Sequence, residues 1–362
     1  PILTYLMFAS PPKSPIMPVE SLAHLDGTFF GATGPTSDTV FSPWSLLHTL
    51  LILGKTVSAQ EFHQLYSAIR LDVNVLGSGG VTKVLEGVQQ DKAIEIGANV
   101  FARNCHPTPA YIKGVIKAFG CEPCALKSAA QVNAWCASAT HNHIQKIVDN
   151  IDNVDAILIS AIFFKAAWKT PFNKRSTRPQ LFTPFSGKGK EVPMMHKNEK
   201  MQYKHVNGMQ LVVLPYNDSG VTAVIGLPDA KGPEALAAAG SALLTPGCVT
   251  GTYSTKVTLA LPKFKMESSH ELLPMLKGMG VPTAGLDCTH SLGCPMDISS
   301  VIQKAILIVD EEGTTAAAVT AVMMKRGCAR PEPKTEVICD RPFWFLLFLG
   351  DTLLFKAAKC EA

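Results

Sequence analysis

Two cysteines separated by two residues, Cys121 and Cys124, form a CxxC pair of the kind that supports thiol redox chemistry or binds zinc. A structural zinc site needs four ligands, and no second CxxC or nearby histidine pair supplies the other two. Cys105 next to His106 is a further candidate, but Cys-His catalysis requires the two side chains to meet in space. We therefore interpret the cysteines as ordinary thiols or as members of a structural disulfide, and we expect no bound metal.

His270 and Glu271 begin a pattern similar to that of zinc proteases. The second histidine of such a motif must lie four residues after the first, and that position holds Pro274. The chain also lacks the GxSxG of hydrolases, the Walker loop that binds phosphates, and the GxGxxG of dinucleotide-binding proteins. These motifs predict neither an enzyme nor a cofactor.

The stretch "DEEGTTAAAVTAVMMKRGCARPEPK", which begins at Asp310, is unusual because it carries no charge from Gly313 to Met324. Three consecutive alanines after a possible cap at Thr314 favour a short helix. The alternative is an exposed loop that can later become a strand, with Gly313 as its pivot. Small or β-branched side chains would then share one face, at Thr314, Ala316, Ala318, Thr320 and Val322. Such a face can enter a sheet without burying a charge, and these residues alone leave both interpretations open.

The composition is that of a chain with a substantial core. Of its 362 residues 47% are hydrophobic and 17% charged, which argues against global disorder. A net charge of +4 comes from scattered lysine and arginine, so nucleic acid is not an expected partner. The longest apolar runs, such as "FWFLLFL" from Phe343, are far shorter than the roughly 18 to 20 residues that span a bilayer, so we expect no membrane segment.

The elements that must position these residues change along the chain. Ser42 precedes an apolar helical segment "PWSLLHTLLIL", and Ser128 precedes "AAQVNAWCASATHNHIQKIV", which also has helical spacing. The second half contains strand patterns, among them "AILISAIFFKAAW", "VTAVIGLP", "KVTLALPKFKM" and "KAILIVD", together with a helix in "SSHELLPMLKGMG" that Pro274 interrupts. Helices followed by irregularly spaced strands predict an α+β protein.

At this point the residues resemble the serpin family. "EEGTTAAA" from Glu311 is similar to the hinge of an inhibitory serpin, and "RPFWFLLF" from Arg341 to the family's buried strand after the reactive loop. The resemblance continues upstream in "FSPWS", "THNHIQKI", "SAIFFKAAWKTPF" and "LPKFKMESSHELLPMLKGMG", in family order from about Ser21 onward. Secreted serpins of ticks and mites are the most similar group.

The resemblance implies the serpin fold, with three β-sheets, about nine helices and an exposed reactive loop. It implies one domain over residues 1–362, with a loose lead-in at 1–20 and the hinge, reactive loop and following strand at 311–340. A serine protease would attack the loop, form a covalent acyl-enzyme, and be trapped when the cleaved loop enters the main sheet. We expect a secreted, extracellular monomer that inhibits trypsin-like proteases. The alternative is a non-inhibitory serpin that binds host defence proteins, such as complement proteins, or a small ligand.

Family spacing from Gly313 places the attacked bond near Gly327. A trypsin-like pocket selects arginine or lysine, so we expect cleavage between Arg326 and Gly327. Strict spacing would instead cut between Gly327 and Cys328, which suits a protease with a small pocket. Lys325 is a third possibility, and Arg330 is disfavoured by the proline that follows it.

Other roles follow from the resemblance, residue by residue. The hinge would comprise Glu311, Glu312, Gly313, Thr314, Thr315, Ala316, Ala317 and Ala318. A polar cluster called the shutter would comprise Ser42, Ser45, Ser160 and Gln303, of which the last two replace the usual Asn and His. Trp168 would lie at the breach, where the loop enters, and Asn217 begins a glycosylation sequon. From Lys55 to Arg103 inclusive the chain has only five Lys and Arg residues, so heparin activation is not expected.

Overall fold

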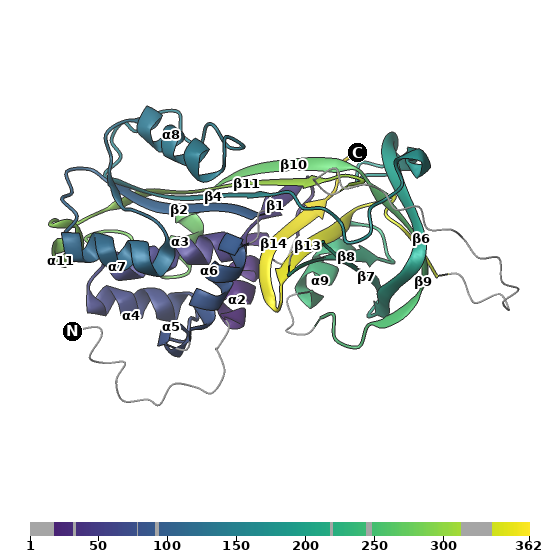
Figure 1. Ribbon diagram of the computed structural model, residues 1–362, viewed down its shortest axis with the longest axis horizontal. Coiled ribbons are helices and arrows are strands. Elements are labelled where there is room, and N and C mark those ends of the chain that lie inside the picture. Colours follow the sequence, from purple (N-terminus) through teal and green to yellow (C-terminus); the bar gives the residue numbers. More distant parts are fainter. Residues whose placement is uncertain are drawn as a thin grey trace, which may run out of the picture.

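A computed structural model describes residues 18–31, 34–77, 79–90, 94–217, 220–243, 248–312 and 335–362 (Figure 1). The helices of these ranges are α2 (Val19–Phe30), α3 (Pro43–Thr56), α4 (Ala59–Ala68), α5 (Asn74–Gly77), α6 (Gly80–Gln90), α7 (Pro109–Phe119), α8 (Ala129–Ala139), α9 (Pro233–Ala242), α10 (Leu273–Gly278) and α11 (Thr289–Leu292), with a 3-10 turn η1 (Lys174–Ser176). The strands are β1 (Thr39–Phe41), β2 (Ile94–Ala102), β3 (Cys124–Ala125), β4 (Ala156–Phe164), β5 (Arg178–Phe182), β6 (Lys190–Val206), β7 (Met209–Pro215), β8 (Val221–Pro228), β9 (Tyr253–Pro262), β10 (Phe264–Glu271), β11 (Ile298–Val309), β12 (Thr335–Ile338), β13 (Phe343–Leu349) and β14 (Thr352–Lys359). The expected α+β class is confirmed.

A five-stranded sheet has the order β10-β11-β4-β2-β3. Its central pair, β11 and β4, is parallel, whereas β10 with β11 and β2 with β4 are antiparallel. Every residue of β4 is buried, because helices cover both faces of the sheet. Figure 1 shows α8 on one face and α3, α6 and α7 on the other.

The second sheet has nine strands, with β1-β14-β13-β8-β7-β6-β9-β12 in sequence and β5 beside β6. The resemblance implies three sheets, but the strands of the described residues form two continuous sheets. The 17-residue strand β6 is the reason, since it pairs with β5 near one end, with β7 near the other and with β9 between. One long strand therefore joins two of the expected sheets.

Helix α3 lies at the centre of the core and contacts β2, β4 and β14, so it links the two sheets. Its start follows the sequence pattern, because the Ser42 side chain accepts a hydrogen bond from the Ser45 amide and Pro43 occupies the first turn. Thirteen of its fourteen residues are buried, all except Lys55. The helix thus brings Ser42 and Ser45 directly against the five-stranded sheet.

Two predicted helices differ from the structure. The helix after Ser128 ends at Ala139 rather than continuing to Val148, because His141 and Asn142 adopt positive φ and the Thr140 hydroxyl bonds to Cys136. The segment from Ser268 to Glu271 extends β10, and Pro274 lies in the first turn of α10 instead of interrupting it. Local helical spacing was overridden by strand pairing in the second case.

Candidate functional site

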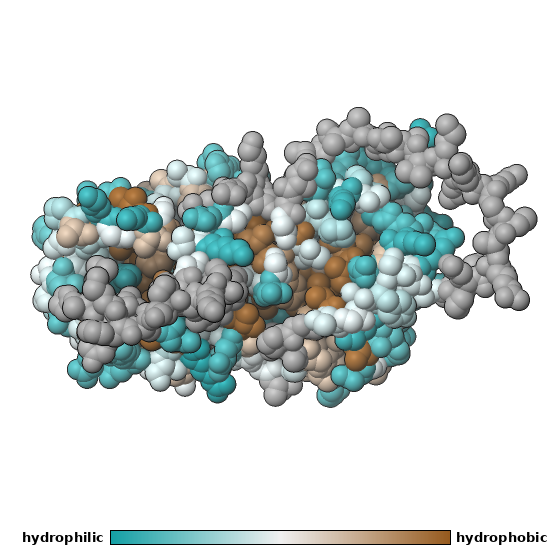
Figure 2. Space-filling model, turned by 60° about the horizontal axis from the view of Figure 1, so that its bottom comes forward, coloured by the Kyte–Doolittle hydropathy of each residue, from teal (hydrophilic) through white to brown (hydrophobic). Residues whose placement is uncertain are grey.

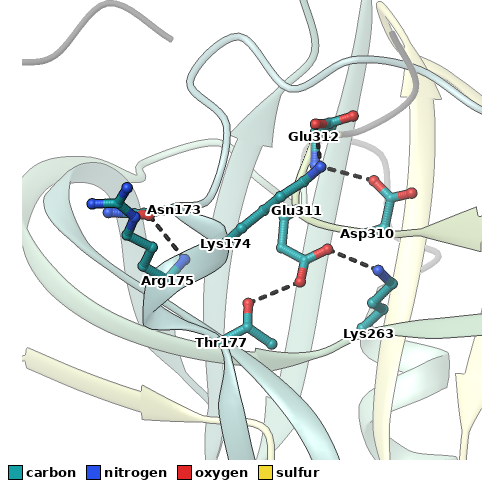
Figure 3. A network of polar contacts seen from close by, with 8 residues as sticks. All are labelled: Asn173, Lys174, Arg175, Thr177, Lys263, Asp310, Glu311 and Glu312. Carbon is teal, nitrogen blue, oxygen red and sulfur yellow. Dashed lines mark hydrogen bonds and ion pairs between the residues drawn. The ribbon is translucent and has the colours of Figure 1, made fainter. Parts of the chain in front are cut away.

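The candidate site begins where β11 ends, at Asp310, Glu311 and Glu312 (Figure 3). Backbone carbonyls of all three accept hydrogen bonds from the segment after β4. The Trp168 amide donates to Glu312 at 3.1 Å, its indole Nε1 to Asp310 at 2.8 Å, and the Phe172 amide to Glu311 at 2.8 Å. The last described residues before position 313 are therefore fixed to the chain that follows β4.

The Glu311 side chain adds a second attachment. It is 8% exposed, and its two oxygens accept hydrogen bonds from Lys263 at 2.9 Å and from the Thr177 hydroxyl at 2.9 Å. Burial by itself would raise the pKa of Glu311, but the bond from Lys263, the residue's own amide and Thr177 together hold that pKa below its usual value. Glu311 is therefore a carboxylate at neutral pH, and it ties β11 to segments before β5 and β10 (Figure 3).

Trp168 is 2% exposed, and its side chain lies beneath the end of β11, where it contacts Asp310. Its ring stacks on Tyr216, with centroids 4.2 Å apart and planes 14° from parallel. On the outer side Glu312 pairs with Lys174 at 2.5 Å, and the Glu312 amide bonds to the Asp310 carboxylate at 3.0 Å. We expect the exposed Glu312–Lys174 pair to contribute little, and the buried contacts of Glu311 and Trp168 to dominate.

The seam between β4 and β11 runs away from this region along the whole sheet. Paired residues extend from Ala156 opposite Ile298 to Phe164 opposite Leu307, with one irregularity near Ser300. No strand of the described residues lies between them. The seam is therefore closed in this structure by a direct parallel ladder.

A buried polar cluster crosses the seam near its middle, where Gln303 of β11 lies opposite Ser160 of β4. The Gln303 amide group donates to the Ser42 carbonyl at 2.9 Å and to Ser160 Oγ at 3.3 Å, and its oxygen accepts from the Ser42 amide at 2.8 Å. Ser160 Oγ and Ser45 Oγ are 2.6 Å apart, and Ser42 Oγ donates to Leu354 at 2.6 Å. The glutamine and serine that replace the usual residues thus form a complete network.

Several predicted residues lie outside the described part of the chain. They are the remaining hinge residues Gly313, Thr314, Thr315, Ala316, Ala317 and Ala318, and the reactive-bond candidates Arg326, Gly327 and Cys328. Asn217 is exposed, and its amide donates to Ala167 at 2.7 Å. Of the other predicted residues, Ser160 and Gln303 lie on the two strands of the seam, Trp168, Glu311 and Glu312 follow these strands, and Ser42 and Ser45 lie at the start of α3.

The sequence did not reveal the partners of Glu311. Lys263 lies in the short link between β9 and β10, and Thr177 follows η1, so neither carries a local motif. His270 and Glu271 have structural contacts: His270 Nε2 bonds to the Val40 carbonyl at 2.9 Å, and Glu271 accepts from the Leu273 and Val301 amides. Among the described residues no group of three or more His, Cys, Asp or Glu is arranged to hold a metal ion.

Comparisons with known proteins agree on one family. The model of the family described as "Serpin (serine protease inhibitor)" matches residues 30–358. Iris from the tick Ixodes ricinus is 32% identical over 284 residues, which is 72% of this chain and 74% of Iris. Ipis-1 from Ixodes persulcatus is 34% identical over 236 residues, 61% of this chain and 62% of Ipis-1. The solved structure of Serpin48 from the insect Tenebrio molitor, described as a highly specific serpin, has the same fold, with a TM-score of 0.83. The superposition covers 95% of this chain and 98% of Serpin48, at 22% sequence identity.

Proposed function

Because this chain belongs to the serpin family of serine protease inhibitors, we propose that it traps trypsin-like serine proteases as a suicide substrate. The target attacks the segment after Glu312 and forms an acyl-enzyme through its own Ser-His-Asp triad. Residues from Gly313 to about Arg326 then enter the five-stranded sheet as a new central strand. Insertion of a cleaved serpin loop is a known case of strand addition.

The observation that supports insertion most directly is the parallel pairing of β4 and β11. β11 leads straight to Glu312, so a chain that reverses at Gly313 runs antiparallel to both strands of the seam. One parallel ladder would be exchanged for two antiparallel ladders, which are slightly more stable per residue. The site therefore has the topology that a returning strand needs.

The energy of insertion comes from new hydrogen bonds and apolar burial. Roughly a dozen residues would join the ladder at about 0.5 to 1.5 kcal/mol each, so the release is on the order of ten kcal/mol. The contacts at the start of the segment must remain or re-form while the seam opens. Attachment of Glu311 to Lys263 and Thr177 fits this requirement, since it fixes the residues that directly precede the proposed pivot.

The reactive bond proposed is Arg326–Gly327, because a trypsin-like pocket strongly prefers a basic residue. Incubation with trypsin tests it, followed by denaturing electrophoresis and mass measurement of the released C-terminal peptide. We expect a covalent adduct near the summed masses and a peptide that begins at Gly327.

Arg326→Ala should abolish the adduct with trypsin, whereas the matched variant Lys325→Ala should retain it. If an elastase-like protease instead forms the adduct and releases a peptide that begins at Cys328, the bond moves by one residue and the target is a protease with a small pocket. Clean cleavage of the wild type without any adduct would contradict the inhibitory function.

A second candidate, binding of a small apolar ligand, is favoured by a pocket of about 550 Å³ beside α2. Its lining is mainly apolar and includes Leu22 of α2, Val224 of β8, Phe348 of β13 and Leu353 of β14. Figure 2 shows a hollowed apolar area near the middle of the molecule, at about the same position along the horizontal axis as β13 and β14 in Figure 1. Binding of an environment-sensitive apolar dye, and its displacement by a lipid-like competitor, test this function. Val224→Lys should abolish dye binding. The absence of saturable dye binding to the wild type would exclude the ligand-binding function.

The setting of this activity is also part of the proposal. We propose a secreted, extracellular monomer whose whole chain acts as one inhibitory domain, glycosylated at Asn217. Among the described helices, none combines the length and apolar character that crossing a bilayer requires. Mass measurement before and after removal of N-linked glycans, with Asn217→Gln as the control, tests the modification.

A further inference from the structure

Five cysteines gather at the end of the five-stranded sheet that lies away from Glu311. They follow β2, flank the end of α7, lie in β3 or flank α11, and they are Cys105, Cys121, Cys124, Cys288 and Cys294. Neighbouring thiols within this group influence one another's ionisation. None of the five is disulfide-bonded in this structure.

Cys105 and Cys294 belong to segments that are hydrogen-bonded to each other. The His106 amide donates to the Leu292 carbonyl at 2.8 Å, and the Thr108 amide to the Ser291 carbonyl at 2.9 Å. These two bonds hold the segments side by side, with Cys105 one residue before His106 and Cys294 two residues after Leu292. Cys105 is buried and its thiol donates to the Ala102 carbonyl at 3.1 Å, whereas Cys294 is half-buried against the same core.

Electrostatics places the two thiols in one environment. Burial is the main cause of the raised pKa of Cys105, and the charge of Cys294 is the next. The Cys105 thiol is therefore protonated at neutral pH. This matters for how a bond between them would form.

We propose that Cys105 and Cys294 form a disulfide that links the two halves of the five-stranded sheet. A small-molecule disulfide is the oxidant: a thiolate of one cysteine attacks it and releases one thiol, and the second cysteine then displaces the other thiol. Two protein thiols and one small disulfide thus yield one protein disulfide and two small thiols. Half-buried Cys294 is the more accessible thiol and reacts first. An extracellular setting, which rests on the proposed function, would favour the oxidised form.

Pairings between cysteines on the same side do not cross the seam. Cys121 and Cys124 both belong to the β2 and β4 side, and Cys288 and Cys294 both precede β11 with only α11 between them. Cys288 is fully buried, and burial raises its pKa to about 12, so it is the less reactive of the two. Of the pairs that cross the seam, Cys105 with Cys294 combines two segments that are hydrogen-bonded to each other with a half-buried thiol that an oxidant can reach.

The position of this bond gives it a consequence for loop insertion. A new strand moves β11 away from β4 by one strand spacing, about 4.8 Å. Disulfide-linked residues keep their Cα atoms within about 7 Å, so the bond would oppose opening of the sheet at this end. The oxidised protein would admit the loop near Glu311 but resist its complete insertion.

Peptide mapping under non-reducing conditions tests the bond itself. The full chain is equilibrated with oxidised glutathione, then digested and analysed by mass spectrometry. We expect a linked peptide pair that contains Cys105 and Cys294 and disappears on reduction. The Cys294→Ser variant should lose it, whereas Cys248→Ser, a half-buried cysteine outside the group, should keep it. Free Cys105, or Cys105 bonded to any other cysteine, would overturn the assignment.

The mechanical role needs a second readout. A catalytic amount of a metalloprotease, which forms no acyl-enzyme, cleaves the reactive segment, and the melting temperature is measured before and after. We expect the oxidised wild type to lose most of the rise that the reduced wild type and Cys294→Ser display. A full rise in the oxidised protein would overturn the restraint. If reduced protein and Cys294→Ser show no rise either, the proposed inhibitory function fails, and the disulfide stands or falls on the peptide map.

Discussion

Replacement of Gln303 by methionine tests the polar cluster that crosses the seam. Methionine has nearly the volume and shape of glutamine but cannot form its hydrogen bonds. Gln303 is completely buried, and its side chain forms three hydrogen bonds, two with the Ser42 backbone and one with Ser160. Gln303→Met removes all three without a large change in packing.

The cost can be worked out from the partners that remain. The Ser42 carbonyl still accepts from Leu46 at 3.2 Å, and Ser160 Oγ still bonds to Ser45 at 2.6 Å. The Ser42 amide is left buried without an acceptor, which costs about 1 to 3 kcal/mol, and the two other lost bonds about 0.5 to 1.5 kcal/mol each. Burial of the more apolar methionine offsets part of this, so we expect a net loss of about 2 to 4 kcal/mol.

Urea unfolding followed by tryptophan fluorescence measures this difference. The matched control is Gln202→Met, the same chemical change at an exposed position of β6, for which we expect less than about 0.5 kcal/mol. If the cluster also holds the seam closed, as we propose, Gln303→Met should convert more rapidly on gentle heating to a form that no longer forms the proposed protease adduct. A variant as stable as the wild type, with an unchanged rate of conversion, would refute the role of the cluster.

Three further predictions concern charged and titratable groups. Glu311→Gln should lower the free energy of unfolding at neutral pH by only about 1 kcal/mol, because the partner Lys263 is partly exposed to solvent. The pKa of Glu311 is lowered in the folded protein, so the difference between variant and wild type should shrink as the pH falls below 4.5. A difference that denaturant titrations show to be independent of pH would contradict the ion pair. Burial lowers the pKa of His48 to about 4, an effect that the nearby Phe119 backbone partly opposes. The free energy of unfolding should therefore fall by about 3 kcal/mol as the pH is lowered from 6.5 to 4. His48→Gln should lose this pH dependence, and an equal dependence in both proteins would contradict the role of His48. Lys356 bonds to the buried Asp26 at 2.7 Å, so Lys356→Met should lower the free energy of unfolding by about 3 to 5 kcal/mol. The double variant with Asp26→Asn should recover much of this stability. Thermal melts in which the double variant is no more stable than Lys356→Met would contradict the buried ion pair.

The sequence predicted those parts of the site that depend on local pattern. Ser42 before an apolar helix and the buried strand of β4 could be inferred because capping residues and strand patterns are local. The resemblance to serpins is confirmed by the family match. The continuous pairing that joins two expected sheets depends on how β6 bends, which no short window of sequence encodes.

The contacts of the candidate site were largely out of reach. Lys263 and Thr177 converge on Glu311 from positions 48 and 134 residues away in the chain, so only the fold brings them together. The helix predicted after Ser128 was too long because its continuation has helical spacing, while a left-handed turn at His141 ends it. Gln303 was expected to alter the polar cluster, but its complete set of partners depends on the register of β11 with β4.

Amide hydrogen exchange of residues 314–326, measured by mass spectrometry before and after cleavage, tests the central claim most directly. If these residues become a strand between β4 and β11, their exchange should slow by about a hundredfold or more after cleavage, with β4 and β11 remaining protected. Exchange that is equally fast in the intact and the cleaved protein would contradict insertion and, with it, the inhibitory mechanism.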